Sequence, residues 1–258
     1  MPARRPPRAP AWPSIEAHRR GVVCACDVPT LDSLVRLLEA VDAVDGVVGY
    51  KLGSLLTLRH GLVEVVRAAR KLTAKPLLYD HQKAGLDIPS MAAEYVGACR
   101  DAGVEALILF PLGGPTAVDA FVGETLRAGL RPVVGGALPL DDYTTRGGGY
   151  VSPAALERIT TRALALGARD FIVPATAPPA VRAMARRLAG RHDARLFLPG
   201  IGALGGEIDA AFRAAGDVAA YAIIGRAIYS DRHPGAAARR FADEALSLGG
   251  GARLRRTP

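Results

Sequence analysis

Three charged residues stand close together in the segment LLYDHQKAGLDIP, residues 77–89: Asp80, Lys83 and Asp87. They follow an apolar run that is typical of a buried strand. A lysine with carboxylates on either side stays protonated, because nearby opposite charge favours the ammonium form. Such a group could stabilise developing negative charge or deliver a proton. The alternative is a solvated loop, and the rest of the sequence is needed to separate the two.

Two kinds of segment alternate along the chain. Eight short apolar runs rich in Val, Ile and Leu occur at residues 21–29, 45–53, 75–83, 104–112, 131–139, 169–176, 195–202 and 218–227. Segments with helical apolar spacing separate them, for example residues 31–41 and 153–167. Continuous apolar runs suit parallel strands that are covered on both faces. Eight strand–helix repeats predict an α/β fold of the (β/α)8 TIM barrel type, with a doubly wound open sheet as the alternative.

A barrel gives the polar residues a common location, because barrel active sites lie at the carboxyl ends of the strands. Asp27, Lys51, Asp80 and Lys83 all fall at predicted strand ends. We therefore expect them to converge on one mouth of the barrel. A solvated surface charge is the alternative for any one of them taken alone.

Glycine-rich turns follow the last two apolar runs, in PGIGALGGEID (199–209) and IIGRAIYSD (223–231). Turns of this kind expose backbone N–H groups, and the position after strands seven and eight is where barrels usually hold phosphate. Arg226 could add a bidentate contact to the same group. The pattern predicts a phosphate site, with a turn that serves only the chain reversal as the alternative.

The formal net charge of +8 is concentrated at the two ends of the chain. The first twenty residues hold five arginines and one glutamate, and the last ten hold three arginines, so that the remainder is near +1. With 5% aromatic residues as well, this distribution disfavours a nucleic-acid binder. The composition predicts a disordered basic arm over residues 1–20, one catalytic domain over 21–247 and a flexible tail over 248–258.

Cys24, Cys26 and Cys99 are too few and too irregularly spaced for a disulfide framework or a zinc ribbon. Cys24 and Cys26 are expected on one face of a buried strand. The basic N-terminus is not followed by a signal-peptide pattern, and no run has the length needed to span a bilayer. We expect a cytoplasmic protein with no membrane partner.

Taken in order, these motifs resemble those of the orotidine 5'-phosphate decarboxylase family. The matching stretches are ACDVP, YKLG, DHQKAGLDIP, PGIGALGG and IGRAIYSDRHPGAA, which together cover nearly the whole body of the chain. The resemblance implies decarboxylation of orotidine 5'-monophosphate to uridine 5'-monophosphate in pyrimidine nucleotide biosynthesis, with no metal or organic cofactor. It also implies a homodimer whose subunits share their active sites.

The same resemblance implies a role for each matching residue. Asp27 and Lys51 would be ribose-side members of a charge network, with Asp80 and Lys83 as its central pair. Asp87 would be supplied across the dimer interface to the neighbouring site. The residues implied to hold the phosphate are Gly202, Gly225 and Arg226.

The chemistry of this reaction accounts for the charged cluster. Loss of CO2 from C6 of a pyrimidine leaves a vinyl carbanion with no attached electron sink. A fixed cation must therefore lie beside C6, and an acid must deliver a proton. Lys83 can do both, and carboxylates around it would orient it before the reaction.

The spacing of the cluster departs from the family pattern of Asp, one residue, Lys, two residues, Asp. Here two and then three residues intervene. Alternation along a strand would place Asp80 on one face with Gln82 and not with Lys83, so we expect a β-bulge near His81 and Gln82. Asp87 has a second interpretation, as the cap of the helix that IPSMAAEYV begins.

Two further departures concern substrate recognition. Leu204 stands where the family carries a glutamine in the phosphate loop, and leucine cannot donate that hydrogen bond. After the fifth run, residues 138–140 (Leu, Pro, Leu) replace a Ser or Thr that reads the pyrimidine, and Thr144, Thr145 or Arg146 could substitute from the longer loop. These changes leave room for an analogue with a modified base as substrate.

Two other functions fit parts of the pattern. Hexulose-phosphate synthases and ketogulonate-phosphate decarboxylases of the same barrel group keep the Asp and Lys cluster but use Mg2+ to hold an enediolate. These enzymes require an acidic metal ligand after the second strand, where this chain has Lys51. A non-catalytic nucleotide-binding barrel is the other alternative, and the presence of Asp27, Lys51, Asp80 and Lys83 argues against it.

Overall fold

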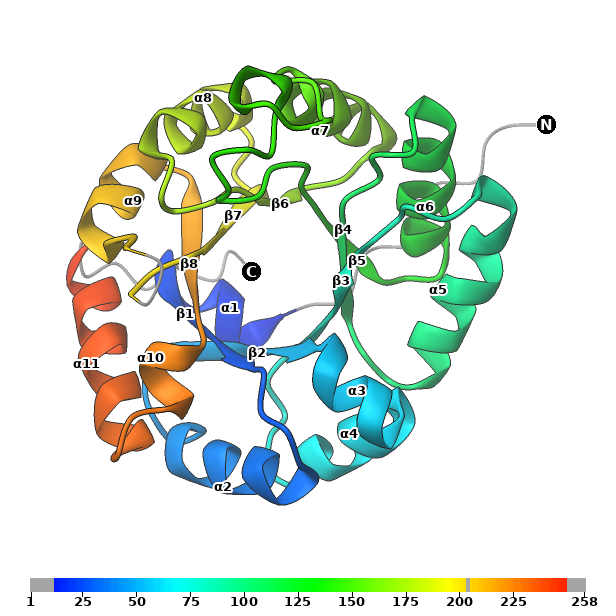
Figure 1. Ribbon diagram of the computed structural model, residues 1–258. Helices are drawn as coiled ribbons and strands as arrows, with labels where there is room; N and C mark the ends of the chain where they lie inside the picture. Colours follow the sequence, from blue (N-terminus) through cyan, green and yellow to red (C-terminus); the bar gives the residue numbers. More distant parts are fainter. Residues whose placement is uncertain (1–11, 203–204, 250–258) are drawn as a thin grey trace, which may run out of the picture.

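Eight parallel strands close into a barrel in the computed structural model, which describes residues 12–202 and 205–249, with the backbone alone at Gln82 and Lys83. Neighbouring strands pair in chain order and β8 pairs with β1 (Figure 1). The strands are β1 (Arg20–Cys26), β2 (Val47–Gly53), β3 (Leu77–Ala84), β4 (Ala106–Leu109), β5 (Arg131–Val134), β6 (Asp170–Ile172), β7 (Arg195–Pro199) and β8 (Ala219–Ile224). Each of the eight apolar runs supplies one strand, which confirms the predicted (β/α)8 barrel.

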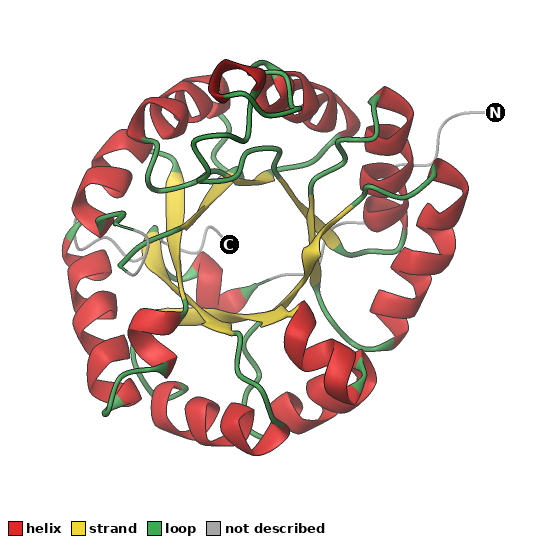
Figure 2. Ribbon diagram, in the orientation of Figure 1, coloured by secondary structure: helices red, strands yellow, loops and turns green. Residues whose placement is uncertain are grey.

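Apart from α1, which lies within the ring in this view, the helices form a ring outside the strands (Figure 1 and Figure 2). The α-helices are α1 (Pro13–Glu16), α2 (Leu31–Val41), α3 (Ser54–His60), α4 (Leu62–Arg70), α5 (Ala92–Asp101), α6 (Pro115–Arg127), α7 (Ala155–Leu166), α8 (Pro178–Leu188), α9 (Ile208–Ala215), α10 (Arg226–Tyr229) and α11 (Pro234–Ser247). Two 3-10 helices, η1 (Pro89–Met91) and η2 (Thr145–Gly147), lie in loops after β3 and β5. Within the described residues, no helix combines the length and apolar character that a membrane span requires.

Alternation along each strand divides the apolar side chains into two layers. One layer fills the barrel interior and includes Val23, Ala25, Leu78, Ile108 and Phe197. The other lies between the strands and the helices and includes Cys24 and Cys26, as predicted for one face of β1. Both thiols and that of Cys99 are free and buried. The inward positions of β1, β2 and β3 are the ones that continue into the charged residues of the mouth.

The segment before β1 is part of the folded domain, which corrects the predicted arm over residues 1–20. Trp12 is 1% exposed and packs edge-on against Phe197, with ring centroids 6.2 Å apart. The Tyr221 hydroxyl donates to the carbonyl oxygens of Ile15 and His18 at 3.0 and 2.9 Å. The segment therefore closes the amino-terminal end of the barrel. Residues 1–11 and 250–258, which were assigned to the arm and the tail, lie outside the described residues.

Charged residues pack against this closing segment inside the barrel. Arg131 Nε lies 2.8 Å from Asp170 Oδ2, and Arg195 lies 3.2 Å from Asp170 Oδ1 and 3.2 Å from Glu16 Oε1. The Arg131 guanidinium also stacks over the Trp12 ring at 4.6 Å. Arg131, Asp170 and Arg195 are buried, so each depends on its partners for solvation. This layer is structural and lies at the end of the barrel opposite the predicted active site.

Candidate active site

Three of the predicted residues meet at the carboxyl ends of β1, β2 and β3. Lys51 Nζ lies 2.9 Å from Asp27 Oδ1, 3.1 Å from Asp27 Oδ2 and 3.4 Å from Asp80 Oδ2. The three strands are adjacent, with Ala25 paired to Lys51 and Lys51 paired to Leu78. Their inward positions therefore project into one space. The predicted convergence of Asp27, Lys51 and Asp80 on one mouth is what the structure shows.

Burial strengthens the electrostatic interactions within this charge network, because solvent screens them less. The Lys51 and Asp80 side chains are 10% and 8% exposed, whereas the Asp27 side chain is 40% exposed and faces the mouth. Burial lowers the pKa of Lys51, but the carboxylates of Asp80 and Asp27 outweigh burial and leave that pKa above its usual value. Lys51 is thus an ammonium group at neutral pH, within hydrogen-bond distance of two carboxylates.

Gly53 makes room for the Asp27 carboxylate. A Cβ atom at position 53 would stand 2.0 Å from Asp27 Oδ1 and 3.6 Å from Lys51 Nζ. The φ of Gly53 is −88°, which any residue can adopt, so the requirement for glycine is purely steric. Sequence reasoning treated this glycine as the end of an apolar run, and no signal in the sequence alone connects it to Asp27.

The β3 strand carries the predicted bulge. Tyr79 pairs with Leu107 of β4, and the next paired residue is Ala84, opposite Leu109. The backbone between them, residues 80–83, is therefore longer than the matching part of β4. The prediction of an irregularity near His81 and Gln82 is confirmed. The bulge allows the backbone of Lys83 to depart from the alternation that would separate it from Asp80, while the Lys83 side chain lies outside the described part of the structure.

A small hydrogen-bonded group supports the bulge from the outside of the barrel. The Tyr79 hydroxyl lies 2.5 Å from His81 Nδ1 and 3.3 Å from Thr57 Oγ1. The His81 ring in turn contacts the Tyr95 ring, with centroids 6.3 Å apart. Burial raises the pKa of the Tyr79 hydroxyl, which stays protonated and able to donate. Of these residues the sequence singled out only His81, as part of the expected bulge; together they tie the bulge to α3 and α5.

Asp87 does not cap a helix, so the capping interpretation is wrong. Its Oδ1 accepts a hydrogen bond from the backbone N–H of Ile88 at 2.7 Å. The N-cap position of η1 is occupied by Ile88, and no side chain caps that helix. Asp87 is exposed beside a cavity of about 300 Å³ lined by His81, Ala84, Gly85, Leu86, Tyr95 and Phe121. Its side chain is therefore exposed at the surface of the chain.

The two glycine-rich turns lie against each other. Gly202 has φ +75°, and a Cβ atom there would meet the Ala227 side chain of α10 at 3.0 Å. Gly206 N–H donates to Gly200 O at 3.0 Å, which closes the turn after β7. Gly225 precedes α10, and Arg226 is exposed at the first position of that helix. The turn residues predicted to hold phosphate are therefore neighbours, while Leu204 lies outside the described residues.

Tyr229 lies against the turn after β8 and was missed by the sequence analysis. A Cβ atom at Gly225 would stand 3.3 Å from Cε1 of its ring. Burial, followed by the charge of Asp27, raises the pKa of Tyr229, whereas Arg226 and Lys51 lower it. Its place three residues after Arg226, in the first turn after β8, is the signal that could have identified it.

Close contacts between backbone atoms of residues 141–151 shape the loop after β5. Thr144 pairs with Val151 in an isolated bridge, and Cβ atoms at Gly147 and Gly149 would stand 1.9 and 1.8 Å from backbone oxygens of residues 141 and 142. Thr144 is half-buried, and within the described residues its side chain makes no hydrogen bond. The structure thus explains the glycine run but does not join Thr144 to the Lys51 network.

A closed (β/α)8 barrel with a partly buried Asp–Lys–Asp network at the carboxyl ends of its strands defines this protein as a TIM-barrel enzyme. Comparison with known sequences gives the family. The chain belongs to the orotidine 5'-phosphate decarboxylase / HUMPS family, whose sequence profile matches residues 21–241.

Individual relatives agree with this assignment. Orotidine 5'-phosphate decarboxylase of Methanococcoides burtonii is 28% identical over 227 residues, which cover 86% of this chain and 96% of the relative. The enzyme of the same name from Pyrococcus furiosus is 29% identical over 225 residues, with coverages of 86% and 96%. The crystal structure of orotidine 5'-monophosphate decarboxylase from Methanocaldococcus jannaschii with the inhibitor BMP superposes with a TM-score of 0.73 at 22% identity, over 87% of this chain and 98% of that one. At 22% identity, the similarity to the Methanocaldococcus jannaschii structure shows the fold alone.

Proposed function

We propose that this protein decarboxylates orotidine 5'-monophosphate to uridine 5'-monophosphate without a cofactor, as a carboxy-lyase of pyrimidine nucleotide biosynthesis. The observation that carries the proposal is the Lys51 ammonium held between Asp27 and Asp80 at the barrel mouth, in a chain of this family. A network that is charged and fixed before substrate arrives is suited to a reaction whose barrier lies in developing charge.

In the proposed reaction, the bond between C6 and the carboxylate breaks and its electron pair stays on C6 while CO2 leaves. Lys83, on the bulge next to Asp80, stabilises the carbanion and transfers a proton to C6, and water then restores the proton on the amine. Asp80 and Lys51 hold the charges around this centre, and Asp27, which is more exposed, faces the ribose hydroxyls. The reaction consumes one proton and needs no electron acceptor.

The turns after β7 and β8 are the proposed phosphate site. Gly202 and Gly225 let the backbone approach the ligand closely, and Arg226 supplies charge-assisted hydrogen bonds. The contact between Gly202 and Ala227 supports a single site formed by both turns. The substrate preference of this chain would differ from that of its relatives at Leu204 and at the loop that carries Thr144. The alternative substrate is an analogue of orotidine 5'-monophosphate with a modified base.

The position of Lys51 favours this reaction over that of a Mg2+-dependent synthase of the same family. An enediolate-stabilising Mg2+ requires carboxylate oxygens as ligands. Here an ammonium group occupies the space between the Asp27 and Asp80 carboxylates, at hydrogen-bond distance from both. A divalent cation at this place would have to displace the lysine and would be repelled by it.

We further propose a homodimer with shared active sites. Apolar side chains are exposed on segments that follow two neighbouring strands, β2 and β3. They include Leu58 at 74% exposure and Leu86 and Ile88 at 62% each. Asp87 lies between the latter two and is exposed, with one carboxylate oxygen bonded to the Ile88 N–H, and its side chain is proposed to enter the neighbouring subunit's site. Exposed apolar residues on segments after adjacent strands are suited to an interaction surface. Buried free thiols support a reducing, cytoplasmic location.

An ultraviolet assay of the purified protein with orotidine 5'-monophosphate tests the proposed function. We expect turnover that persists in EDTA and falls by about 10²- to 10⁴-fold in Lys83→Ala, because the proton donor is lost. Lys71→Ala, which removes an exposed lysine at the end of α4, is the matched control and should keep full activity. Loss of activity in EDTA with rescue by Mg2+ would assign the protein to the synthase branch instead.

A further inference from the structure

A second cavity lies at the opposite end of the barrel from the charge network. Its volume is about 720 Å³, and it is formed by the end of α8 and the following loop, the end of α9, the start of β8 and Arg19 before β1. These segments lead into the amino ends of strands, whereas Asp27, Lys51 and Asp80 lie at the carboxyl ends. The cavity is therefore separate from the proposed active site.

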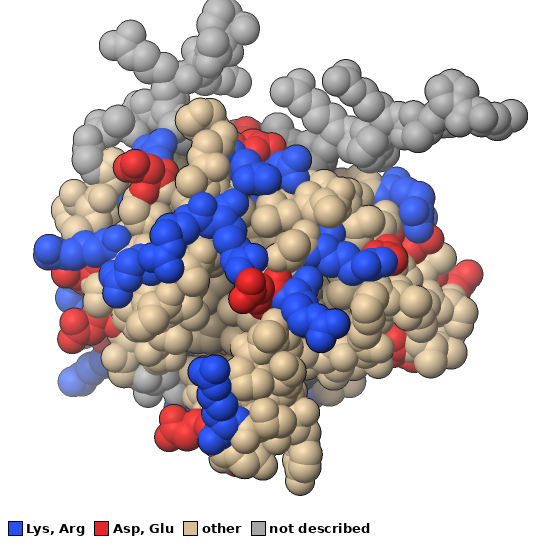
Figure 3. Space-filling model, turned by 90° about the horizontal axis from the view of Figure 1, so that it is seen from above, with Lys and Arg blue, Asp and Glu red and all other residues tan. Residues whose placement is uncertain are grey.

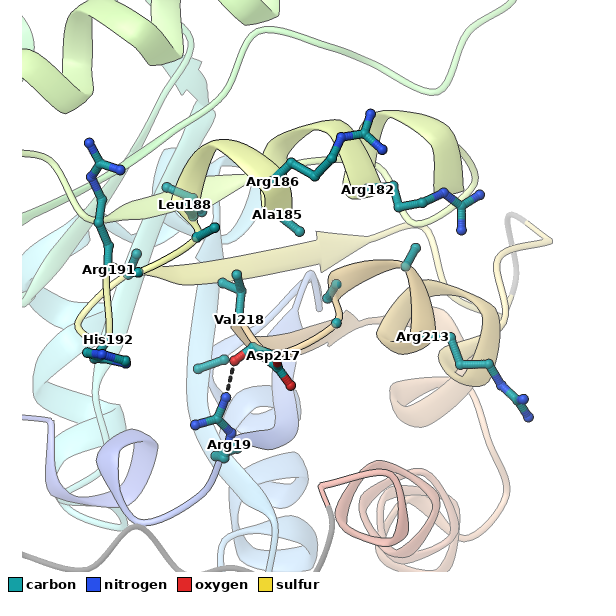
Figure 4. A pocket seen from close by; sticks show the side chains of 17 residues that line it. Arg19, Arg182, Ala185, Arg186, Leu188, Arg191, His192, Arg213, Asp217 and Val218 are labelled. Carbon is teal, nitrogen blue, oxygen red and sulfur yellow. Dashed lines mark hydrogen bonds between the residues drawn. The ribbon is translucent and has the colours of Figure 1, made fainter.

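The lining of this cavity is strongly basic. Six of its side chains are cationic or can become so, against one acid, Asp217: Arg19, Arg182, Arg186, Arg191, Arg213 and His192. Figure 4 shows Arg182 and Arg186 on α8, Arg213 on α9, Arg191 and His192 in the loop after α8, and Arg19 from the segment before β1. Four separate segments thus contribute positive charge to one concave space. Such a space concentrates positive potential and attracts anions.

Arg182 and Arg186 form no ion pair and no side-chain hydrogen bond with any described residue, whereas Arg67, Arg127 and Arg162 each pair with a carboxylate. Exposed arginines outside the cavity, such as Arg146 and Arg239, are also unpaired among the described residues, so what distinguishes Arg182 and Arg186 is that both line the cavity. They lie one helical turn apart on α8, an arrangement of like charges that slightly destabilises an isolated helix. Helix stability therefore does not account for them, and an anionic ligand would.

The other charged groups add to this imbalance. Arg191 donates to the backbone oxygen of Arg187 at 3.0 Å, and Arg19 donates to the backbone oxygen of Asp217, so both keep their charge. Among the described residues, a carboxylate pairs with just one arginine of the cavity: Asp209 lies 2.8 Å from Arg213. The face of the molecule seen in Figure 3 likewise shows basic side chains gathered across its middle with fewer acidic ones among them.

The inner surface of the cavity is lined by small apolar residues, among them Ala194, Ala214 and Ala215, which are almost fully buried. Alanines keep the space open, so the long arginine side chains can reach a molecule within it. The volume falls in the range of small-molecule sites. A single phosphate would meet only part of the cationic rim, whereas a chain of phosphates can contact several guanidinium groups at once.

We propose that this cavity binds a small polyphosphate anion, of the kind carried by nucleoside triphosphates and by inorganic polyphosphate. Arg182 and Arg186 hold one end of the phosphate chain, and Arg191 and Arg19 hold the other. The bound anion neutralises the like-charged pair on α8 and links α8 to the segments before β1 and β8. The site is independent of the phosphate site at the barrel mouth.

Isothermal titration of the full chain with tripolyphosphate, ATP and adenosine tests this proposal. We expect both phosphates to bind and adenosine not to bind, with the tighter of the two phosphates identifying the source of the ligand. Arg182→Gln/Arg186→Gln should weaken both phosphates at least about tenfold, since each charge-assisted contact contributes on that order. Arg36→Gln/Arg239→Gln, which removes two exposed helical arginines outside the cavity, should bind as the native protein does.

Arg226→Gln separates this cavity from the barrel mouth. Binding of tripolyphosphate should survive in that variant, because Arg226 lies at the other end of the barrel. Retained affinity in the Arg182/Arg186 variant, or loss in Arg226→Gln alone, would overturn the proposal. So would binding of a DNA duplex that depends on these arginines when tripolyphosphate does not bind. Should the double variant not fold, Arg191→Gln in the loop after α8 gives the same comparison.

Discussion

Gly53 and Asp27 share a space that only one of them can occupy: a Cβ atom at position 53 would lie 2.0 Å from Asp27 Oδ1. The glycine therefore fixes the position of the carboxylate that faces the barrel mouth. Through it, the glycine also fixes one of the two partners of Lys51. A residue with no functional group of its own thus controls the geometry of the charge network.

Gly53→Ala is expected to lower kcat/KM for orotidine 5'-monophosphate by about tenfold or more, because Asp27 must leave its contact with Lys51 and a charge-assisted contact of this kind contributes about 1.5 to 3 kcal/mol. Steady-state ultraviolet kinetics would measure the change. Gly97→Ala is the matched control, since a Cβ atom on that α5 glycine meets nothing within 4 Å. Unchanged kinetics in Gly53→Ala would show that the position of Asp27 does not matter for turnover.

The raised pKa of Lys51 predicts a loss of stability at high pH. The folded protein keeps the lysine proton at a pH where the unfolded chain releases it, above about pH 10.5. The contribution of this proton is complete below that pH and is lost as pH rises through the folded-state pKa. The difference in unfolding free energy between the native protein and Lys51→Met, measured in urea, should be constant from about pH 7 to 9 and should change in favour of Lys51→Met above about pH 10.5.

The comparison isolates Lys51 because the buried tyrosines, which also titrate at high pH, are present in both proteins. Lys71→Met, which removes an exposed lysine, should show the same pH dependence as the native protein. A difference between native protein and Lys51→Met that stays constant to the highest pH at which both fold would mean that Lys51 does not titrate in this range.

Arg226→Ala is expected to weaken uridine 5'-monophosphate at least about tenfold, with little effect on uridine, because a lost charge-assisted fork affects the phosphate alone. Titration calorimetry with both ligands would measure it. Arg36→Ala, on the outer face of α2, serves as the control. An equal loss for nucleotide and nucleoside would place Arg226 away from the phosphate.

The strands and most of the charge network could be predicted because both follow from local pattern. Continuous apolar runs specify buried parallel strands, and the carboxyl ends of such strands bring Asp27, Lys51 and Asp80 together. The bulge could be predicted too, since the spacing from Asp80 to Lys83 does not fit strand alternation. These inferences need only sequence order and strand geometry.

The parts that were missed depend on contacts between distant residues. Trp12 and Ile15 are two apolar residues in a segment rich in Pro and Arg that is too short to show a hydrophobic period. They are buried because they pack into the amino-terminal opening of the barrel. The basic cavity could not be predicted from the net charge near +1, because that sum does not show which arginines, such as Arg182, gather in one place without a carboxylate partner among the described residues. The sequence pattern indicates only that Gly53 ends a strand, whereas the requirement for glycine there comes from the Asp27 carboxylate, which occupies the space of a Cβ atom.

Asp87 supplies the most direct test of site sharing. Its carboxylate is exposed between two exposed apolar residues, Leu86 and Ile88, on the surface proposed as the dimer interface. If it enters the neighbouring site, Asp87→Ala and Lys83→Ala should each be nearly inactive alone. A mixed dimer would then contain one site with both residues native and one with neither.

Random exchange of subunits makes half of the dimers mixed, so activity should recover to about one quarter of the native value in a closed two-fold dimer. Mixing Asp80→Ala with Lys83→Ala is the matched control, because Asp80 and Lys83 lie on the same β3 segment and no exchange can rebuild a complete site. Native mass spectrometry would establish that subunits exchange in both mixtures. Exchange without recovered activity in the Asp87→Ala and Lys83→Ala mixture would confine Asp87 to its own subunit, and recovery in that mixture alone would place its carboxylate in the partner's site.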